Sequence, residues 1–167
     1  GDHPWRSYTR LAYPEFDLCA SVAERTFDVV ICEQVLEHIP DPWVGARTLY
    51  DLCRPGGHVI VSTPFLIKVH NEPDDFWRFT VAGLRLLLEK AHLEVVTLKS
   101  WGNRSCARAN FHHWVARRPW QSMENEELFP IVVWAVARRP VAESSGPGPA
   151  PIGRPSRTED ETGPVDS

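Results

Sequence analysis

The chain has 167 residues, 43% of them hydrophobic, and a formal net charge of −4. This length and apolar content indicate one folded domain with its own core. The acidic balance argues against a dedicated nucleic-acid binder, because such proteins are usually basic. No signal peptide and no apolar run long enough to span a bilayer is visible. We therefore expect a cytoplasmic protein that binds neither nucleic acid nor membranes.

Composition divides the chain into two parts. Residues 1–140 contain the apolar, periodic segments, whereas residues 141–167 are rich in Pro, Gly and Ser. A segment of the second kind cannot bury enough apolar surface to offset the entropy lost on ordering. We predict one folded domain over residues 1–140 and a disordered tail over residues 141–167.

The first half of the domain reads as strand, helix, strand. Residues 27–32 form an apolar run typical of a buried strand. Asp41 is a good N-cap, and Pro42 suits the first turn of a helix. Arg54-Pro55-Gly56-Gly57 should end this helix and turn the chain. The apolar residues 58–63 then predict a second buried strand.

The second half begins with a long polar loop over residues 68–79. Thr80 is the expected N-cap of a helix that continues to Ala91, with leucines at helical spacing. Residues 93–98 and 129–137 are the remaining predicted strands, and residues 100–128 between them look irregular.

Alternation of strands and helices predicts an α/β fold with right-handed parallel crossovers. We expect the strands at 27–32, 58–63 and 93–98 to be parallel neighbours in one sheet. The strands at 93–98 and 129–137 have no clear helix between them. We therefore expect the last strand to be antiparallel and inserted at the sheet edge.

In an open α/β sheet, ligands bind outside the carboxyl ends of the strands. This rule selects Glu33 and Gln34 after the first strand, and Ser62 and Thr63 at the end of the second. Asp17 ends the segment before the first strand and should belong to the same rim. Each could instead be an ordinary strand end or a turn-forming residue.

Several short motifs occur together in this chain. They are Val35-Leu36-Glu37-His38, Arg54-Pro55-Gly56-Gly57, Ser62-Thr63-Pro64 and Asp75-Phe76-Trp77-Arg78-Phe79-Thr80. In this order they resemble class I S-adenosylmethionine-dependent methyltransferases of the type 11-like group. The resemblance implies a Rossmann-like methyltransferase sandwich, with a mostly parallel sheet, an antiparallel last strand and S-adenosylmethionine as cofactor.

The Gly-rich turn that cradles the cofactor in that family does not occur in these 167 residues. We therefore expect an N-terminally incomplete fold that binds S-adenosylmethionine weakly by itself. The sheet edge where earlier strands belong would be exposed, which favours a homo-oligomer.

The resemblance also assigns roles to residues near the first strand. Asp17, followed by Leu18, takes the place of the acidic residue beside the adenine. Glu33, Gln34 and Val35 take the places of residues that line the methionine part of the cofactor.

The polar loop follows a strand on the ligand-binding edge, so it can cover a substrate site. His70 could act as general base, because a neutral imidazole takes a proton near neutral pH. The predicted substrate-side residues are His38, Asp75, Trp77 and Arg78. The alternatives are a structural His38, and an Asp75–Arg78 brace with Trp77 packed beneath it. A His/Glu/Asp metal cluster is disfavoured because the spacing fits no common site, and the four cysteines show no C-x-x-C pair.

The sequence favours two functions. The first is methyl transfer from S-adenosylmethionine to a small-molecule acceptor, with O-, N- and C-methylation unresolved. The second is a non-catalytic relative that keeps the fold as a binding or partner subunit. An NAD-dependent oxidoreductase is disfavoured because the chain has no G-x-G-x-x-G turn.

Overall fold

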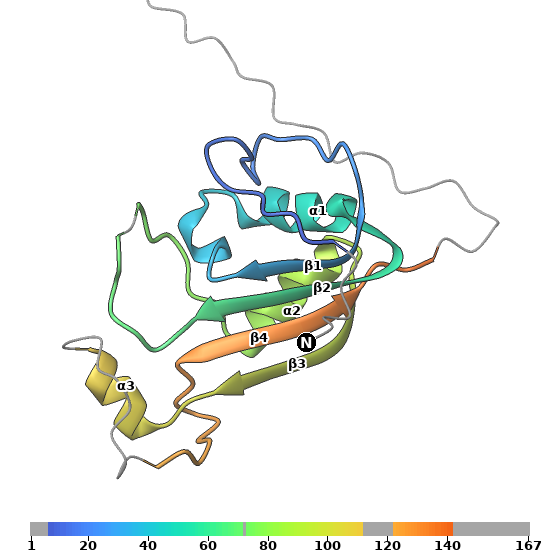
Figure 1. Cartoon of the computed structure of the whole chain (residues 1–167). Coiled ribbons are helices and arrows are strands. Elements are labelled where there is room, and N and C mark those ends of the chain that lie inside the picture. The colour runs from blue at the N-terminus through green and yellow to red at the C-terminus, as the bar shows by residue number, and fades with distance from the viewer. Residues whose placement is uncertain (1–6, 72, 112–121, 142–167) are drawn as a thin grey trace, which may run out of the picture.

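The structure, a computed structural model, describes residues 7–71, 73–111 and 122–141. Within them, four strands form one sheet in the order β1-β2-β4-β3 (Figure 1). The strands are β1 Phe27–Glu33, β2 Cys53–Pro64, β3 Glu94–Trp101 and β4 Val132–Arg138. β1 and β2 are parallel, and β4 is antiparallel to both β2 and β3. The predicted α/β class with an antiparallel last strand is therefore confirmed.

The position of β4 corrects the predicted strand order. β4 lies between β2 and β3, not at the sheet edge, so β2 and β3 run in the same direction without being neighbours. Val133, Ala135 and Ala137 of β4 are fully buried. A strand with this many buried apolar residues belongs inside a sheet, where its backbone groups pair on both sides.

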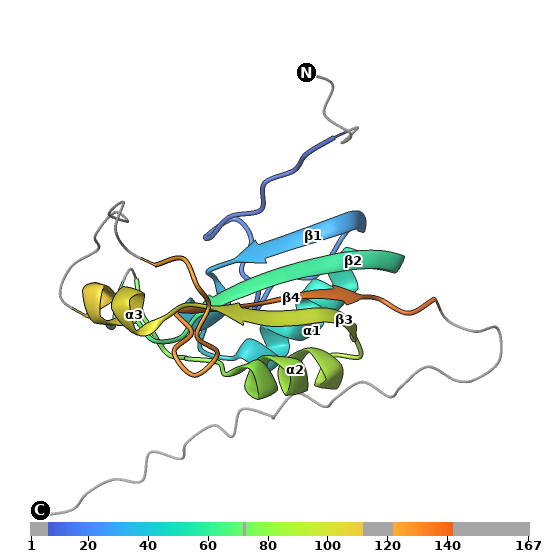
Figure 2. The ribbon, with the colours of Figure 1, turned by 90° about the horizontal axis from the view of Figure 1, so that it is seen from below.

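Two helices cover one face of the sheet. They are α1 Pro42–Leu52 and α2 Val81–Lys90, and Figure 2 shows both on the same side. Asp41 accepts hydrogen bonds from the first backbone N–H groups of α1, and Thr80 does the same for α2. These caps satisfy donors that a helix cannot pair internally, so both predicted N-caps are confirmed.

The core lies between these helices and the sheet. Its fully buried members include Leu36, Leu49, Val59, Val61, Leu84, Leu88 and Val133. The opposite face of the sheet is more open in the described residues, and Ile31 of β1 is 61% exposed there.

The Arg54-Pro55-Gly56-Gly57 segment is part of a strand and not a separate turn. Phe27 pairs with Cys53, and the next pair is Val29 with His58, so four residues of β2 bulge out between them. Gly56 adopts a positive φ of 76° there, a conformation that glycine reaches without strain. The helix therefore ends at Leu52 and the strand begins at Cys53. Pairing of β2 with β1 resumes at His58, beyond the bulge.

Residues 100–128 were expected to be irregular, but they contain a helix. A short helix, α3 Arg104–Asn110, follows β3, and the side chain of Asn103 caps it. The aromatic and basic stretch at His112, His113 and Trp114 lies outside the described residues, as does the predicted tail beyond residue 141. No helix in the described part of the chain is long and apolar enough to cross a membrane.

Candidate active site

The carboxyl ends of β1 and β2 border a cavity of about 580 Å³. Glu33, Gln34, Ser62 and His70 all line it. Ile31, Ile60, Pro64, Ile67, Val132 and Trp134 provide most of its apolar wall. The structure thus brings four of the residues selected from the sequence to one rim, namely Glu33, Gln34, Ser62 and His70.

Gln34 makes a tight turn directly after β1. Its φ is +53°, which is uncommon outside glycine and often marks a functional position. The turn is held by two hydrogen bonds to Ser62 of β2: the backbone N–H of Gln34 donates to the Ser62 carbonyl at 3.0 Å, and Gln34 Nε2 donates to Ser62 Oγ at 3.2 Å. Gln34 therefore has a fixed orientation at the cavity.

Three hydrogen bonds tie the polar loop to the turn after β1, whose 3-10 segment is Leu36–His38. The backbone N–H of Phe76 donates to the Glu37 carbonyl at 2.7 Å, and Trp77 Nε1 donates to the Ile39 carbonyl at 3.0 Å. His38 Nδ1 contacts the carbonyl oxygen of Asp74. These bonds place the loop beside the β1 end, as the sheet topology predicts.

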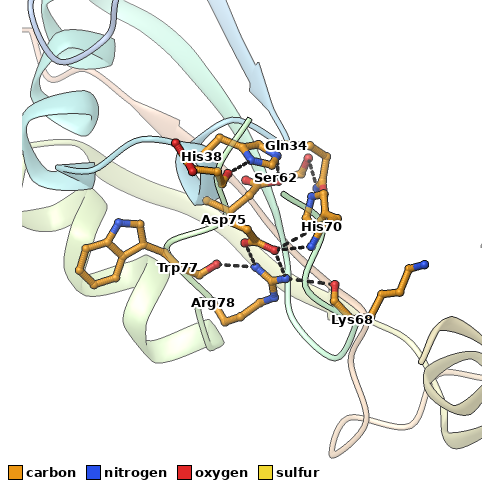
Figure 3. Close-up of polar contacts among 10 residues, drawn as sticks. Gln34, His38, Ser62, Lys68, His70, Asp75, Trp77 and Arg78 are labelled. Carbon is orange, nitrogen blue, oxygen red and sulfur yellow. Dashed lines mark hydrogen bonds and ion pairs between the residues drawn. The ribbon is translucent and has the colours of Figure 1, made fainter. Parts of the chain in front are cut away.

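Asp75 is the centre of the loop's polar contacts (Figure 3). Its side chain is 1% exposed and makes a bidentate ion pair with Arg78, with Oδ2 2.6 Å from Nη2. Oδ2 also accepts from the backbone N–H of His70 at 2.9 Å and lies 3.0 Å from His70 Nδ1. The Arg78 guanidinium is the main reason why the pKa of Asp75 falls to about 2.

The low pKa of Asp75 predicts how the unfolding free energy depends on pH. A carboxyl with a depressed folded-state pKa stabilises the fold above its unfolded pKa and loses that contribution as pH falls through its folded pKa. From 3.8 to about 2, the shift corresponds to about 2 kcal/mol. Between pH 4 and pH 2, the wild-type chain should therefore lose about 2 kcal/mol more unfolding free energy than Asp75→Asn, measured by urea titration.

Asp74→Asn is the matched control for that measurement, since it removes the same charge from the exposed neighbouring residue. Its pH dependence should follow the wild type. Parallel curves for wild type and Asp75→Asn would contradict the assigned ion pair.

Glu37, His38 and His70 form a second polar group at the same place. The Glu37 side chain is fully buried, and neither carboxylate oxygen has a hydrogen-bond partner among the described residues. Burial raises the pKa of Glu37. His38 Nε2 lies 3.7 Å from Glu37 Oε1, and the His38 and His70 rings meet edge to face at 4.8 Å.

One metal-binding atom from each of these three residues lies within 4.8 Å of the others, a spacing that could admit a cation. The spacing of His, Glu and Asp residues along the chain argues against a metal cluster. That spacing does not reveal the group of Glu37, His38 and His70, because residues 37 and 70 meet only after the loop folds back onto the β1 turn.

The other predicted residues lie away from the cavity lining. Asp17 forms an Asx-type turn in which its Oδ1 accepts from the Cys19 N–H at 2.7 Å, and the Leu18 carbonyl accepts from Thr48 Oγ1 at 2.8 Å. Val35 packs against the core. Trp77 points away from His70 (Figure 3). Its ring packs edge to face against Trp43.

Sequence reasoning also missed two residues that line the cavity. Asn110 comes from the unexpected helix α3, and Trp134 comes from β4. Trp134 pairs with Ser62, so the central position of β4 brings it to the cavity. No local sequence signal links either residue to the strand ends.

Comparison of the chain with known proteins identifies its family. The methyltransferase domain family matches residues 9–114. The chain therefore belongs to the methyltransferase domain family, and its fold is that of class I S-adenosylmethionine-dependent methyltransferases.

Sequence relatives include ubiquinone biosynthesis O-methyltransferases. The Vibrio parahaemolyticus protein is 41% identical over 63 residues, which are 36% of this chain and 27% of that protein. The Yersinia pestis protein is 40% identical over 63 residues, which are 38% of this chain and 24% of that protein. The chain thus matches about a quarter of the length of these relatives.

Solved structures show the same fold at low sequence identity. An S-adenosylmethionine-dependent methyltransferase from Mesorhizobium loti has a TM-score of 0.53 and 18% identity, covering 74% of this chain and 67% of that one. A methyltransferase from Bacillus halodurans has a TM-score of 0.51 and 12% identity, covering 76% and 71%.

Proposed function

We propose that this chain takes part in methyl transfer from S-adenosylmethionine to a small-molecule acceptor. The observation that carries the proposal is the shared rim of Glu33, Gln34 and His70 at the carboxyl ends of two parallel strands. This is where open α/β sheets bind ligands. Membership of the methyltransferase family supports the reaction type.

Glu33 and Gln34 are the proposed cofactor-side residues on this rim. A carboxylate accepts hydrogen bonds from ammonium and hydroxyl groups, both of which S-adenosylmethionine carries. Gln34 uses its amide N–H to hold Ser62, which leaves its carbonyl oxygen as an acceptor toward the cavity. Asp17 with Leu18 on the adenine side and Val35 behind the turn remain proposals from the family resemblance.

His70 is the proposed general base on the acceptor side. It lines the same cavity as the proposed cofactor residues and is 21% exposed. Methyl transfer is a direct displacement, so the protein mainly aligns the two reactants and excludes water. A base contributes when the acceptor is a hydroxyl or a protonated amine. His38 and Arg78 are the proposed substrate-side neighbours, and Trp77 ties the loop to the Ile39 carbonyl through Nε1.

Calorimetric titration with S-adenosylhomocysteine tests the cofactor assignment. It should be run on this chain and on an extended form, in which a strand and Gly-rich turn from the methyltransferase family are joined to its amino terminus. We expect binding by the extended form and weak binding by this chain, because a Gly-rich turn is absent from the printed sequence. In the extended form, Glu33→Ala should weaken binding at least about 10-fold, the loss expected for a charged hydrogen bond.

Glu94→Ala is the matched control for Glu33→Ala. It removes an exposed strand carboxylate that pairs with Arg138, at the opposite end of β3 from the cavity. Equal affinities for wild type and Glu33→Ala would contradict the cofactor role. Extended protein without affinity for S-adenosylhomocysteine would favour the alternative, a non-catalytic methyltransferase-like partner subunit.

We also propose that β1 can mediate self-association. Among the described strands, β1 pairs only with β2, so its other edge offers unpaired backbone groups. Such edges template pairing with another chain. Concentration-dependent sedimentation would support a homo-oligomer, and a single monomeric species at high concentration would contradict it.

A further inference from the structure

We propose that Asp75 is a positioning residue for His70, holding its ring with a protonated Nδ1 turned inward so that Nε2 is the atom available to the acceptor. The structural part of this proposal stands on the loop geometry alone. Its catalytic consequence rests on the proposed methyl transfer with His70 as base.

The first support is the double contact between Asp75 and His70. A single carboxylate oxygen, Oδ2, accepts from the His70 backbone N–H at 2.9 Å and lies 3.0 Å from Nδ1 of the same residue. The same oxygen thus bonds the His70 backbone and lies beside Nδ1 of its ring. Nδ1 is buried, although the side chain is 21% exposed and lines the cavity. The accessible part of the ring therefore lies away from Nδ1.

The second support is the fixed charge state of Asp75. Arg78 holds the carboxylate by two N–H groups and also donates to the carbonyls of Trp77 and Lys68, at 2.9 and 3.3 Å. An ionised carboxylate can only accept hydrogen bonds. Nδ1 beside it must therefore carry the proton in a neutral ring, which leaves the lone pair on Nε2.

The third support is the packing around the ring. His38 meets the His70 ring edge to face at 4.8 Å, and His38 is itself held through Nδ1 by the Asp74 carbonyl. Rotation of His70 about its side-chain bonds would bring it against this fixed neighbour. The ring orientation is therefore determined from two sides.

The chemical consequence concerns the proton of the acceptor. As the acceptor oxygen or nitrogen forms its bond to the methyl carbon, the carbon–sulfur bond breaks and its electron pair stays on sulfur. The acceptor's proton moves to Nε2 of His70. The resulting imidazolium carries one positive charge beside the Asp75 carboxylate, which stabilises it, and the proton then leaves to solvent.

Nitrogen NMR of the ¹⁵N-labelled chain tests the tautomer without any substrate. Long-range ¹H–¹⁵N spectra, with His70→Gln to assign the signals, should show neutral His70 protonated at Nδ1. Asp75→Asn should abolish that preference, whereas Asp74→Asn should keep it. A wild-type His70 protonated at Nε2 would overturn the proposal.

Kinetics test the catalytic consequence in a form of the protein that shows the proposed methyl transfer. Asp75→Asn should lower kcat roughly 100-fold with little change in the affinity for S-adenosylhomocysteine, and combining it with His70→Ala should add little further loss. Fully additive losses, or an unchanged kcat, would overturn the positioning role. Absence of methyl transfer together with the expected NMR result would instead reject the proposed function and leave the tautomer assignment standing.

Discussion

His70→Ala should lower kcat roughly 100-fold or more in a form of the protein that shows the proposed methyl transfer, because a general base usually contributes that much. The acceptor for the assay is the best substrate from a screen of phenols, catechols and amines, with S-adenosylhomocysteine release as the signal. Affinity for S-adenosylhomocysteine should change little, because the proposed cofactor contacts come from Glu33 and Gln34 and not from the loop. A selective loss of kcat identifies an interaction made in the transition state.

His92→Asn is the matched control for this experiment. His92 lies in the connection between α2 and β3, outside the polar loop. Its φ is +65°, a conformation that asparagine tolerates. Its activity should equal that of the wild type. A fully active His70→Ala enzyme would reject the base assignment, and an equal loss in both variants would indicate a general effect on folding.

Gly102→Ala should be severely destabilising. A Cβ atom at Gly102 would lie 2.4 Å from the Ile131 backbone nitrogen and 2.5 Å from the Phe129 carbonyl oxygen. Backbone atoms cannot rotate away as a side chain can, so the segment entering β4 would have to move. Because β4 is the buried strand between β2 and β3, we expect a loss of about 3 kcal/mol or more in unfolding free energy.

Gly83→Ala provides the contrast. Gly83 lies in α2, and an added Cβ would meet only Thr80 Oγ1 at 3.4 Å, an ordinary contact. Alanine favours the helix and restricts the unfolded chain, so this variant should gain about 0.5–1 kcal/mol. Urea unfolding monitored by circular dichroism measures both variants. Similar stabilities for the two would contradict the close approach at Gly102.

The sequence by itself indicated most of the elements and the methyltransferase family. Local signals were sufficient for the helix starts, since Asp41 and Thr80 cap the helices from their own side chains. Continuous apolar runs identified β1 and β2 because a strand buried on one face and partly covered on the other needs them. The rule that ligands bind at strand ends selected Glu33, Gln34 and Ser62, and the loop that follows the second strand contributed His70; these four residues line one cavity.

Strand order was decided by tertiary pairing. Nothing local in residues 132–138 states which strands they will pair with, and the run fits an edge or a central position. The buried side chains of Val133, Ala135 and Ala137, and backbone pairing on both sides, place β4 in the interior. The same long-range pairing put Trp134 beside Ser62 and so into the cavity wall.

The polar contacts of the loop were also decided only by the tertiary structure. Asp75 and Arg78 are close in sequence, so their pairing was a reasonable alternative from the start. The approach of Glu37 and His38 to His70 depends on a loop that returns across more than thirty positions to the end of β1. The contact of His70 with Asp75 depends on how that loop folds back on itself over five positions. Sequence spacing does not reveal the approach of the loop to the β1 turn, because the backbone hydrogen bond from Phe76 to the Glu37 carbonyl joins residues that are far apart along the chain.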